Sequence, residues 1–287
     1  MRNVDDAVVR GFGDEWQRFD QRKLSRAELE TLFDSYFHIF PWDKLPPDAR
    51  GFDAGCGSGR WASLVAPRVG QLHCIDASAE ALGVARRNLS ALTNCEFHHA
   101  TVDAMPLAEG AFDFGYSLGV LHHIPDTAAG IAACVAKLKP GAPFLLYLYY
   151  AFDNRPAWYR AIWKSSELLR ALLSRAPRFV RHAGADLAAA LLYFPMARFA
   201  RLLEKLGMNV EAFPLSFYRN RPFYVMRTDA LDRFGTRLEK RFTRAQIETM
   251  MKEAGLRDIV FSDAPPYWCA VGFVERRALS PPNEPAG

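Results

Sequence analysis

The chain has 287 residues, of which 50% are hydrophobic and 24% are charged. These proportions are typical of a globular protein and exclude a disordered, collagenous or low-complexity chain. No run approaches the ~20 apolar residues that span a bilayer, and the start of the chain lacks the apolar run of a signal peptide. We therefore expect a cytoplasmic protein without stable membrane insertion, built as one large domain with an insertion or as two domains.

Basic charge is concentrated in one segment. Residues 152–241 hold 17 Lys and Arg against 8 Asp and Glu, a balance of +9 in a chain of net charge +4, which leaves −5 for the rest. The five cysteines are widely spaced and form no C-x-x-C pair. This spacing indicates neither a disulfide framework nor a metal site.

From residue 50 to 150, short apolar runs alternate with helical patterns. We expect helices at 61–69, 79–92 and 127–138. The strands between and around them are expected at 50–54, 71–76, 95–100, 112–120 and 142–150. This alternation is typical of right-handed crossovers and predicts an α/β fold, a mostly parallel sheet with helices on both faces.

The pattern changes after residue 150. Helical spacing of apolar residues predicts Arg-rich helices at 156–175 and 186–206, and Thr243 can cap a helix at 244–254 before strands at 257–262 and 267–274. We divide the chain into an N-terminal helical cover (1–48), a core (49–151), a helical insertion (152–241), the C-terminal part of the core (242–277) and a tail (278–287).

A glycine cluster, D-A-G-C-G-S-G-R from Asp53 to Arg60, lies where the first strand turns into a helix. Glycines allow backbone N–H groups to approach a ligand closely, and a helix N-terminus favours a negative group. Asp76 ends the second strand, where a carboxylate can accept hydrogen bonds from both ribose hydroxyls. A dinucleotide fingerprint would require glycine at Arg60, so the pattern favours another nucleoside ligand over NAD.

The sequence D-A-G-C-G-S-G-R-W resembles motif I of class I S-adenosylmethionine (SAM) dependent methyltransferases. Further elements agree in order: H-C-I-D-A-S, A-T-V-D-A-M-P-L, F-D-F-G-Y-S-L-G-V-L-H-H-I-P-D and L-K-P-G. The resemblance covers roughly residues 48–150 and 241–275. It implies a Rossmann-like seven-stranded sheet, SAM as cofactor, and a small-molecule methyltransferase whose helical insertion covers the substrate as a lid.

The resemblance also implies a set of cofactor-binding residues at the strand ends and in the N-terminal aromatic segment. They are Trp16, Arg18, Asp53, Gly55, Gly57, Gly59, Asp76, Ala77, Val102, Asp103, Ala104, Leu118 and Gly119. Arg18 would pair with the carboxylate of SAM, Asp76 with the ribose and Asp103 with the adenine amino group. An alternative for the N-terminal segment is an amphipathic helix packed on the sheet edge.

Candidate catalytic residues follow the fourth and fifth strands: His122, Tyr149, Tyr150 and Asn154. His122 is favoured over His123 as a general base, because an imidazole suits proton removal at neutral pH. An alternative is that the histidine pair only shapes the loop.

Candidate substrate-binding residues lie in the basic insertion: Arg155, Tyr218, Arg219, Arg221 and Tyr224. Aromatic and arginine side chains together suit an anionic or carboxylate-bearing acceptor. The alternative is that these arginines are solvated helix faces.

The leading hypothesis is methyl transfer from SAM to a small, anionic molecule of secondary or envelope metabolism. A second hypothesis keeps SAM but lets its amino group attack its own γ-carbon and release methylthioadenosine. Peripheral membrane binding with a lipid or quinone substrate is less favoured. Nucleic acid is not expected as a partner, because N-P-P-Y and D-P-P-Y motifs are absent from the sequence. Oligomeric state is left open.

Overall fold

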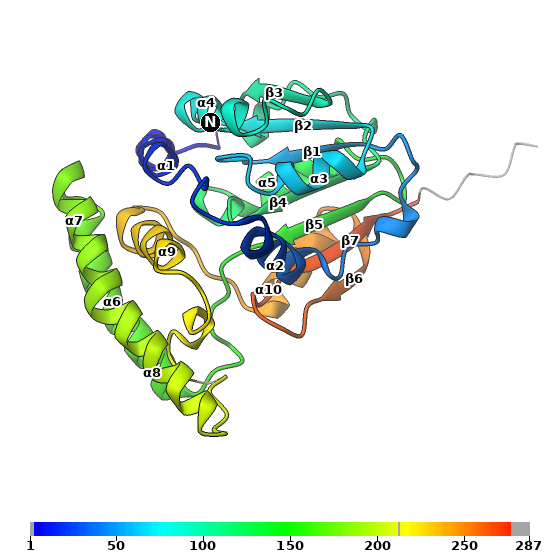
Figure 1. Ribbon diagram of the computed structural model, residues 1–287. Helices are drawn as coiled ribbons and strands as arrows, with labels where there is room; N and C mark the ends of the chain where they lie inside the picture. Colours follow the sequence, from blue (N-terminus) through cyan, green and yellow to red (C-terminus); the bar gives the residue numbers. More distant parts are fainter. Residues whose placement is uncertain (1–2, 212, 277–287) are drawn as a thin grey trace, which may run out of the picture.

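The computed structural model describes residues 3–211 and 213–276. Its centre is a seven-stranded sheet in the order β3-β2-β1-β4-β5-β7-β6 (Figure 1). The strands are β1 (Arg50–Ala54), β2 (Gln71–Asp76), β3 (Cys95–His99), β4 (Phe114–Leu118), β5 (Pro143–Tyr147), β6 (Leu256–Phe261) and β7 (Ala270–Val274). β1 to β5 are parallel, whereas β7 runs antiparallel to β5 and β6. The predicted Rossmann-like, mostly parallel sheet is confirmed.

Helices cover both faces of this sheet (Figure 1). One face packs against α2 (Arg26–Phe37), α3 (Ala62–Val65) and α4 (Ala79–Asn88). The other packs against α5 (Thr127–Val135) and α10 (Arg244–Glu253). Nearly every residue of the central strands β1, β4 and β5 is buried, including the polar Asp53 and Ser117, because helices cover both faces of the sheet.

Several elements are shorter than the sequence predicts. β4 ends at Leu118, not at 120, because the next residue, Gly119, has φ +79° and leaves the strand conformation. The helix expected at 61–69 is α3 followed by a 3-10 turn at Ala66–Arg68, since Pro67 lacks the N–H that an α-helix needs. The predicted tail at 278–287 lies outside the described residues.

The segment after β5 is helical as expected, but it holds more helices than the two predicted. They are α6 (Ala157–Leu173), α7 (Arg178–Ala188), α8 (Phe194–Lys205) and α9 (Phe223–Gly235), with a 3-10 turn at Ser216–Tyr218. A π-helical turn at Ala189–Tyr193 joins α7 to α8 just before Pro195, which cannot donate a backbone hydrogen bond. Action of this segment as a lid stays a prediction.

The new helix α9 lies between the outer helices and the rest of the molecule (Figure 1). It packs against α6 and α7 on one side and against the N-terminal helix α1 (Asp6–Arg18) on the other. The helix α9 therefore connects α6 and α7 to α1, and the division of the chain into a cover, a core and an insertion stays a prediction.

Candidate functional site

A cavity opens at the carboxyl ends of β1, β2 and β4, where the parallel strands all terminate. Its lining is Asn3, Val4, Asp5, Val8, Val9, Phe12, Trp16, Gly55, Cys56, Gly57, Ser58, Arg60, Trp61, Ile75, Asp76, Ala77, Ser78, Ala100, Thr101, Val102, Leu118, Gly119, Val120, His123 and Ile124. The α1 helix supplies one wall and strand ends supply the others. The wall is thus mostly apolar, with a few polar groups placed at strand ends.

Asp76 organises the loop after β1. Its Oδ2 accepts a hydrogen bond from Gly57 N at 2.8 Å, and its Oδ1 accepts one from Ser78 N at 2.8 Å. Burial raises the pKa of Asp76, and these backbone hydrogen bonds partly offset the effect by favouring the ionised form. The carboxylate is therefore held at the cavity wall by two backbone donors.

Two glycines let the chain pass close to its neighbours at this wall. Gly57 has φ +53°, and a Cβ built there would lie 2.9 Å from the Trp16 indole. Gly119 has φ +79°, and a Cβ there would meet no described protein atom within 4 Å. The first glycine admits Trp16 over the loop, and the second leaves room beside the end of β4.

Arg60 brings a cation to the same wall. Its guanidinium lies over the Trp61 ring at 4.2 Å from the centroid, and its Nε is buried without a hydrogen-bond partner among residues 3–211 and 213–276. Among the described residues, Arg60 has no carboxylate oxygen within 4.0 Å and so forms no ion pair. A guanidinium whose Nε is buried without a hydrogen-bond partner is suited to a carboxylate ligand.

Residues 52–141, which contain the glycine loop, Asp76 and the end of β4, match a protein-family profile described as "Methyltransferase domain". Residues 52–141 thus form a methyltransferase domain. Its fold agrees with a SAM-dependent methyltransferase from Methanosarcina mazei, which is 14% identical with a TM-score of 0.51 over 83% of this chain and 99% of that one.

Several sequence relatives share the name ubiquinone biosynthesis O-methyltransferase. The protein of this name from Xanthomonas axonopodis pv. citri is 28% identical over 58% of this chain and 76% of the relative. The one from Burkholderia pseudomallei is 29% identical over 73% of this chain and 96% of the relative.

The cavity fits SAM, the cofactor of the methyltransferase domain. It offers a carboxylate for the ribose at Asp76, an unpartnered guanidinium at Arg60, an apolar wall and open space beside Gly119. Of the residues that the sequence assigned to the cofactor, the following line the cavity: Trp16, Gly55, Gly57, Asp76, Ala77, Val102, Leu118 and Gly119.

The remaining assigned residues lie outside this lining: Arg18, Asp53, Gly59, Asp103 and Ala104. Arg18 pairs with Asp186 of α7 at 2.5 Å, so its guanidinium is already bound by another carboxylate. Asp103 accepts a hydrogen bond from Asn3 N at 3.1 Å. A Cβ at Gly59 would lie 2.9 Å from Leu89, so this glycine serves helix packing.

Asp53 is buried inside the sheet. Its Oδ2 finds no hydrogen-bond partner in the described part of the chain. Burial raises the pKa of Asp53 to about 8, which keeps much of this carboxyl protonated at neutral pH. Asp53 is therefore placed beneath the glycine loop and not in the cavity wall.

His123, not His122, reaches the cavity wall. Its Nδ1 lies 2.7 Å from Leu238 O, and because a carbonyl only accepts, Nδ1 carries the proton of the neutral ring. Burial lowers the pKa of His123 to about 4, so the ring is neutral at pH 7. Its Nε2 then holds a lone pair and has no hydrogen-bond partner among the described residues.

A buried carboxyl group stands behind His123. Asp232 Oδ1 lies 3.6 Å from His123 Nε2, and Asp232 Oδ2 accepts a hydrogen bond from the Tyr149 hydroxyl. Burial and repulsion by Glu239 raise the pKa of Asp232 to about 7. Asp232 can therefore exchange a proton near neutral pH, whereas the His123 ring is neutral there.

The other predicted catalytic residues are placed less favourably. His122 is fully buried, its ring centroid lies 3.9 Å from that of Tyr149, and burial lowers its pKa. Tyr150 packs against Phe152 and Tyr267, and Asn154 is exposed in the turn before α6. Of the four predicted catalytic residues, His122 and Tyr149 are the two with a contact to His123 or Asp232 in the described part of the chain.

The predicted substrate residues separate into two groups. Tyr218 donates a hydrogen bond to Asp229 Oδ2 at 2.8 Å, and Arg221 is partly buried over the Phe217 ring. The others have partners elsewhere: Arg155 bonds to Glu211 O, Arg219 pairs with Glu204, and the Tyr224 hydroxyl accepts from Gln21 N. The structure does not bring all five together.

Sequence reasoning missed the acidic residues of α1 and α9 next to the site. Glu15 is buried, and burial together with the negative charges of Asp232 and Asp229 raises its pKa. No spacing or motif marks these residues, because they come from helices that pair only in the tertiary structure. Arg60 was detectable, since it directly follows the glycine motif.

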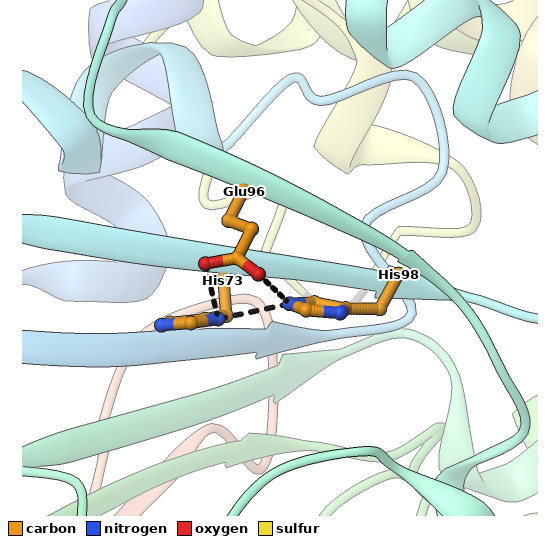
Figure 2. Close-up of side chains that lie close together, drawn as sticks. All are labelled: His73, Glu96 and His98. Atoms are coloured by element: carbon orange, nitrogen blue, oxygen red, sulfur yellow. Dashed lines mark hydrogen bonds and ion pairs between the residues drawn. The ribbon is translucent and has the colours of Figure 1, made fainter.

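A separate cluster lies at the β2 and β3 edge of the sheet (Figure 2). His73 Nδ1 and His98 Nε2 are 2.9 Å apart, with Glu96 carboxylate oxygens 3.6 and 3.5 Å from them. Two nitrogens on one tetrahedral zinc, at about 2.05 Å each, would be roughly 3.3 Å apart. The observed separation is that of a hydrogen bond between the two rings.

Proposed function

We propose that the enzyme transfers the methyl group of SAM to a hydroxyl group of a small aromatic acceptor that carries an anionic group. The observation that carries this proposal is the His123 ring, which lines the cavity and whose buried Nε2 has no hydrogen-bond partner among the described residues. A hydroxyl must lose its proton to become methylated, so O-methylation needs such a base. The relatives are named as O-methyltransferases, which supports the same reaction type.

In this proposal the chain holds SAM by groups already in place. Asp76 accepts from the ribose hydroxyls, Arg60 binds the carboxylate in place of Arg18, and Trp16 covers the loop at Gly57. SAM supplies a methyl group activated by its sulfonium. The protein's contribution is then to orient the two reactants and to exclude water.

The proposed base step uses His123 and Asp232. The acceptor hydroxyl gives its proton to His123 Nε2 as its oxygen bonds to the methyl carbon, and the methyl–sulfur bond breaks with its electrons retained by sulfur. The Asp232 carboxylate, 3.6 Å away, stabilises the imidazolium that forms. Tyr149 keeps Asp232 in place through its hydroxyl.

Arg221 is the proposed partner of the acceptor's anionic group. Burial lowers the pKa of Arg221, and Asp229 and Tyr218 beside it favour its charged form. Together with Tyr218 it is the part of the predicted substrate set that faces the interior. Arg155, Arg219 and Tyr224 are assigned to structural contacts instead.

The test compares His123→Ala with His122→Ala on two phenolic acceptors, one with an ordinary pKa and one ionised at neutral pH. We expect His123→Ala to slow methylation of the first acceptor by about 100- to 10,000-fold and to leave SAM affinity unchanged. The ionised phenol should lose far less activity, because it needs no base. His122→Ala should have the smaller effect on both.

Two outcomes would contradict the proposal. Equal losses on both phenols would show that His123 shapes the site and removes no proton. Formation of methylthioadenosine from SAM alone, without any acceptor, would replace methyl transfer by the intramolecular reaction. Chromatographic identification of the nucleoside product distinguishes S-adenosylhomocysteine from methylthioadenosine in the same samples.

A further inference from the structure

The outer surface of α6, α7 and α8 is unusually rich in exposed large apolar side chains. Leu168, Phe179, Leu191 and Leu206 are 69–76% exposed. The remaining members of this surface, which we call the apolar face, are Trp158, Ile162, Leu169, Leu172, Val180, Leu187, Leu192, Phe194, Phe199, Leu202 and Met208. Monomeric proteins rarely expose so many large apolar side chains on neighbouring helices, so the face is suited to a partner.

Charge on this surface has one sign. Within residues 156–208, the exposed ionisable side chains are all cationic: Arg160, Lys164, Arg175, Arg178, Arg201 and Lys205. The acids of the same segment are half-buried and neutralised, Glu167 by Arg170 and Arg233, Asp186 by Arg18 and Arg227, and Glu204 by Arg219. Of these six exposed cations, Arg178 alone pairs with an acid among the described residues, Asp14 of α1, so the surface presents large apolar side chains together with unneutralised cations.

We propose that the apolar face docks on the surface of a lipid bilayer that contains anionic lipids. Amphipathic helices with Trp, Phe and Leu on one side and Lys and Arg around them lie in the headgroup region of such membranes. Lys164, Arg201 and Lys205 have no ion pair among the described residues, so they are available to lipid phosphates.

A second copy of the chain fits the face less well than a bilayer does. In a two-fold contact the same patch meets itself, so the exposed cations of one copy would face those of the other without acids between them. An anionic membrane surface neutralises these charges and takes up the apolar side chains at once. Charge complementarity therefore favours lipid.

The arrangement of the helices suits peripheral binding. The three helices form one outer layer on the side of the molecule away from β6 and β7 (Figure 1). Among the described residues, no helix is long and apolar enough to cross a membrane. The layer would lie flat on the bilayer, with α9 between it and α1.

Vesicle co-sedimentation of the full chain without SAM or acceptor tests this inference independently of the proposed function. We expect binding to vesicles of phosphatidylglycerol and phosphatidylcholine in equal parts, and loss of binding at high salt. Replacing both Arg201 and Lys205 by Gln should weaken binding about 30-fold at low salt. Leu168→Glu combined with Leu191→Glu should weaken it at least about tenfold.

Val260→Glu is the matched control, because Val260 is 50% exposed but lies on β6. It should bind vesicles like the unaltered chain, and all variants should keep the same SAM affinity and the same unfolding midpoint. Equal binding to pure phosphatidylcholine, or no effect of either double variant, would overturn the inference. So would a dimer in sedimentation velocity that the Leu168 and Leu191 variant dissociates, because the face would then join two copies.

Discussion

At the scale of single residues, the cavity depends on the backbone of the glycine loop. Gly57 has φ +53° and lies under Trp16 of α1, and its N–H bonds to Asp76. Gly57 therefore both leaves room for the Trp16 ring and donates a hydrogen bond to Asp76. An added methyl group would disturb the contact with Trp16 before it disturbs the sheet.

We expect Gly57→Ala to lower SAM affinity at least about tenfold, because its Cβ would displace Trp16 and because φ is strained. Gly110→Ala is the control. Gly110 has φ +61° but a Cβ there meets no described atom within 4 Å, so it carries the strain without the collision. Calorimetric titration with SAM measures both, and equal losses of affinity in the two variants would contradict the role given to Trp16.

We expect substitutions of Arg60 and of Arg18 to differ in their effect on SAM affinity, because only Arg60 is free to bind the carboxylate of SAM. Arg60→Met should lower SAM affinity by about 10- to 150-fold, the value of a charge-assisted hydrogen bond of about 1.5–3 kcal/mol. Arg18→Met should leave the affinity unchanged, because Arg18 is bound by Asp186. Methionine preserves the length of both side chains. If instead Arg18→Met weakened binding and Arg60→Met did not, the sequence-based assignment of Arg18 would be restored.

At the scale of elements, Asp186 ties three helices together. It lies on α7 and accepts hydrogen bonds from Arg18 of α1 and from Arg227 of α9. The α9 helix carries Asp232 and Asp229 toward the site, so this contact also sets where those carboxyl groups lie. One side chain thus links the cover, the insertion and the site.

We expect Asp186→Asn to loosen the packing of α7 on α1 and α9 by about 1 kcal/mol, since the pair is partly exposed and its value is reduced by solvent. Hydrogen exchange should accelerate in α7 and α9 but not in α5. Glu248→Gln, which breaks an exposed pair with Lys252 on α10, is the control. Uniform acceleration across the sheet would indicate global destabilisation and contradict a local link.

At the scale of the whole molecule, buried titratable groups make stability depend on pH. Burial raises the pKa of Asp53 to about 8, so the folded state retains a proton that the unfolded state has released. Stability therefore falls as pH rises from the ordinary carboxyl pKa through about 8. His123 acts in the opposite direction, because burial lowers its pKa to about 4 and its contribution is lost as pH falls below 6.5.

Above pH 6.5 the pH dependence of stability comes from the carboxyl group, because His123 is neutral in both the folded and the unfolded state. We expect the free energy of unfolding to decline between pH 6.5 and 8.5, by up to about 1.4 kcal/mol per pH unit for a single group. Asp53→Asn should reduce this decline, and Asp113→Asn, at the residue just before β4, should not. Urea unfolding at several pH values measures it, and an unchanged slope in Asp53→Asn would show that this carboxyl is ionised in the folded protein.

Much of the core and of the cofactor cavity could be predicted from the chain because the relevant contacts are local. The glycine loop, Asp76 and Gly119 each sit at the end of a strand, and parallel strands bring their carboxyl ends to one edge. The helix capped by Thr243 was also predictable, since its capping box lies within four residues. The predicted end of a strand was wrong where a glycine adopts a positive φ and ends the strand early, as Gly119 does after β4.

The sequence by itself determined the fold class and the loop and strand ends that we propose hold SAM, because alternating patterns and a short motif set both through neighbouring residues. Only the tertiary structure decided which histidine faces the cavity and which carboxyl stands behind it. His122 and His123 are adjacent in sequence, and the turn after β4 sends one ring into the core and the other to the wall. Asp232 meets His123 across more than a hundred residues, through the packing of α9 on the core.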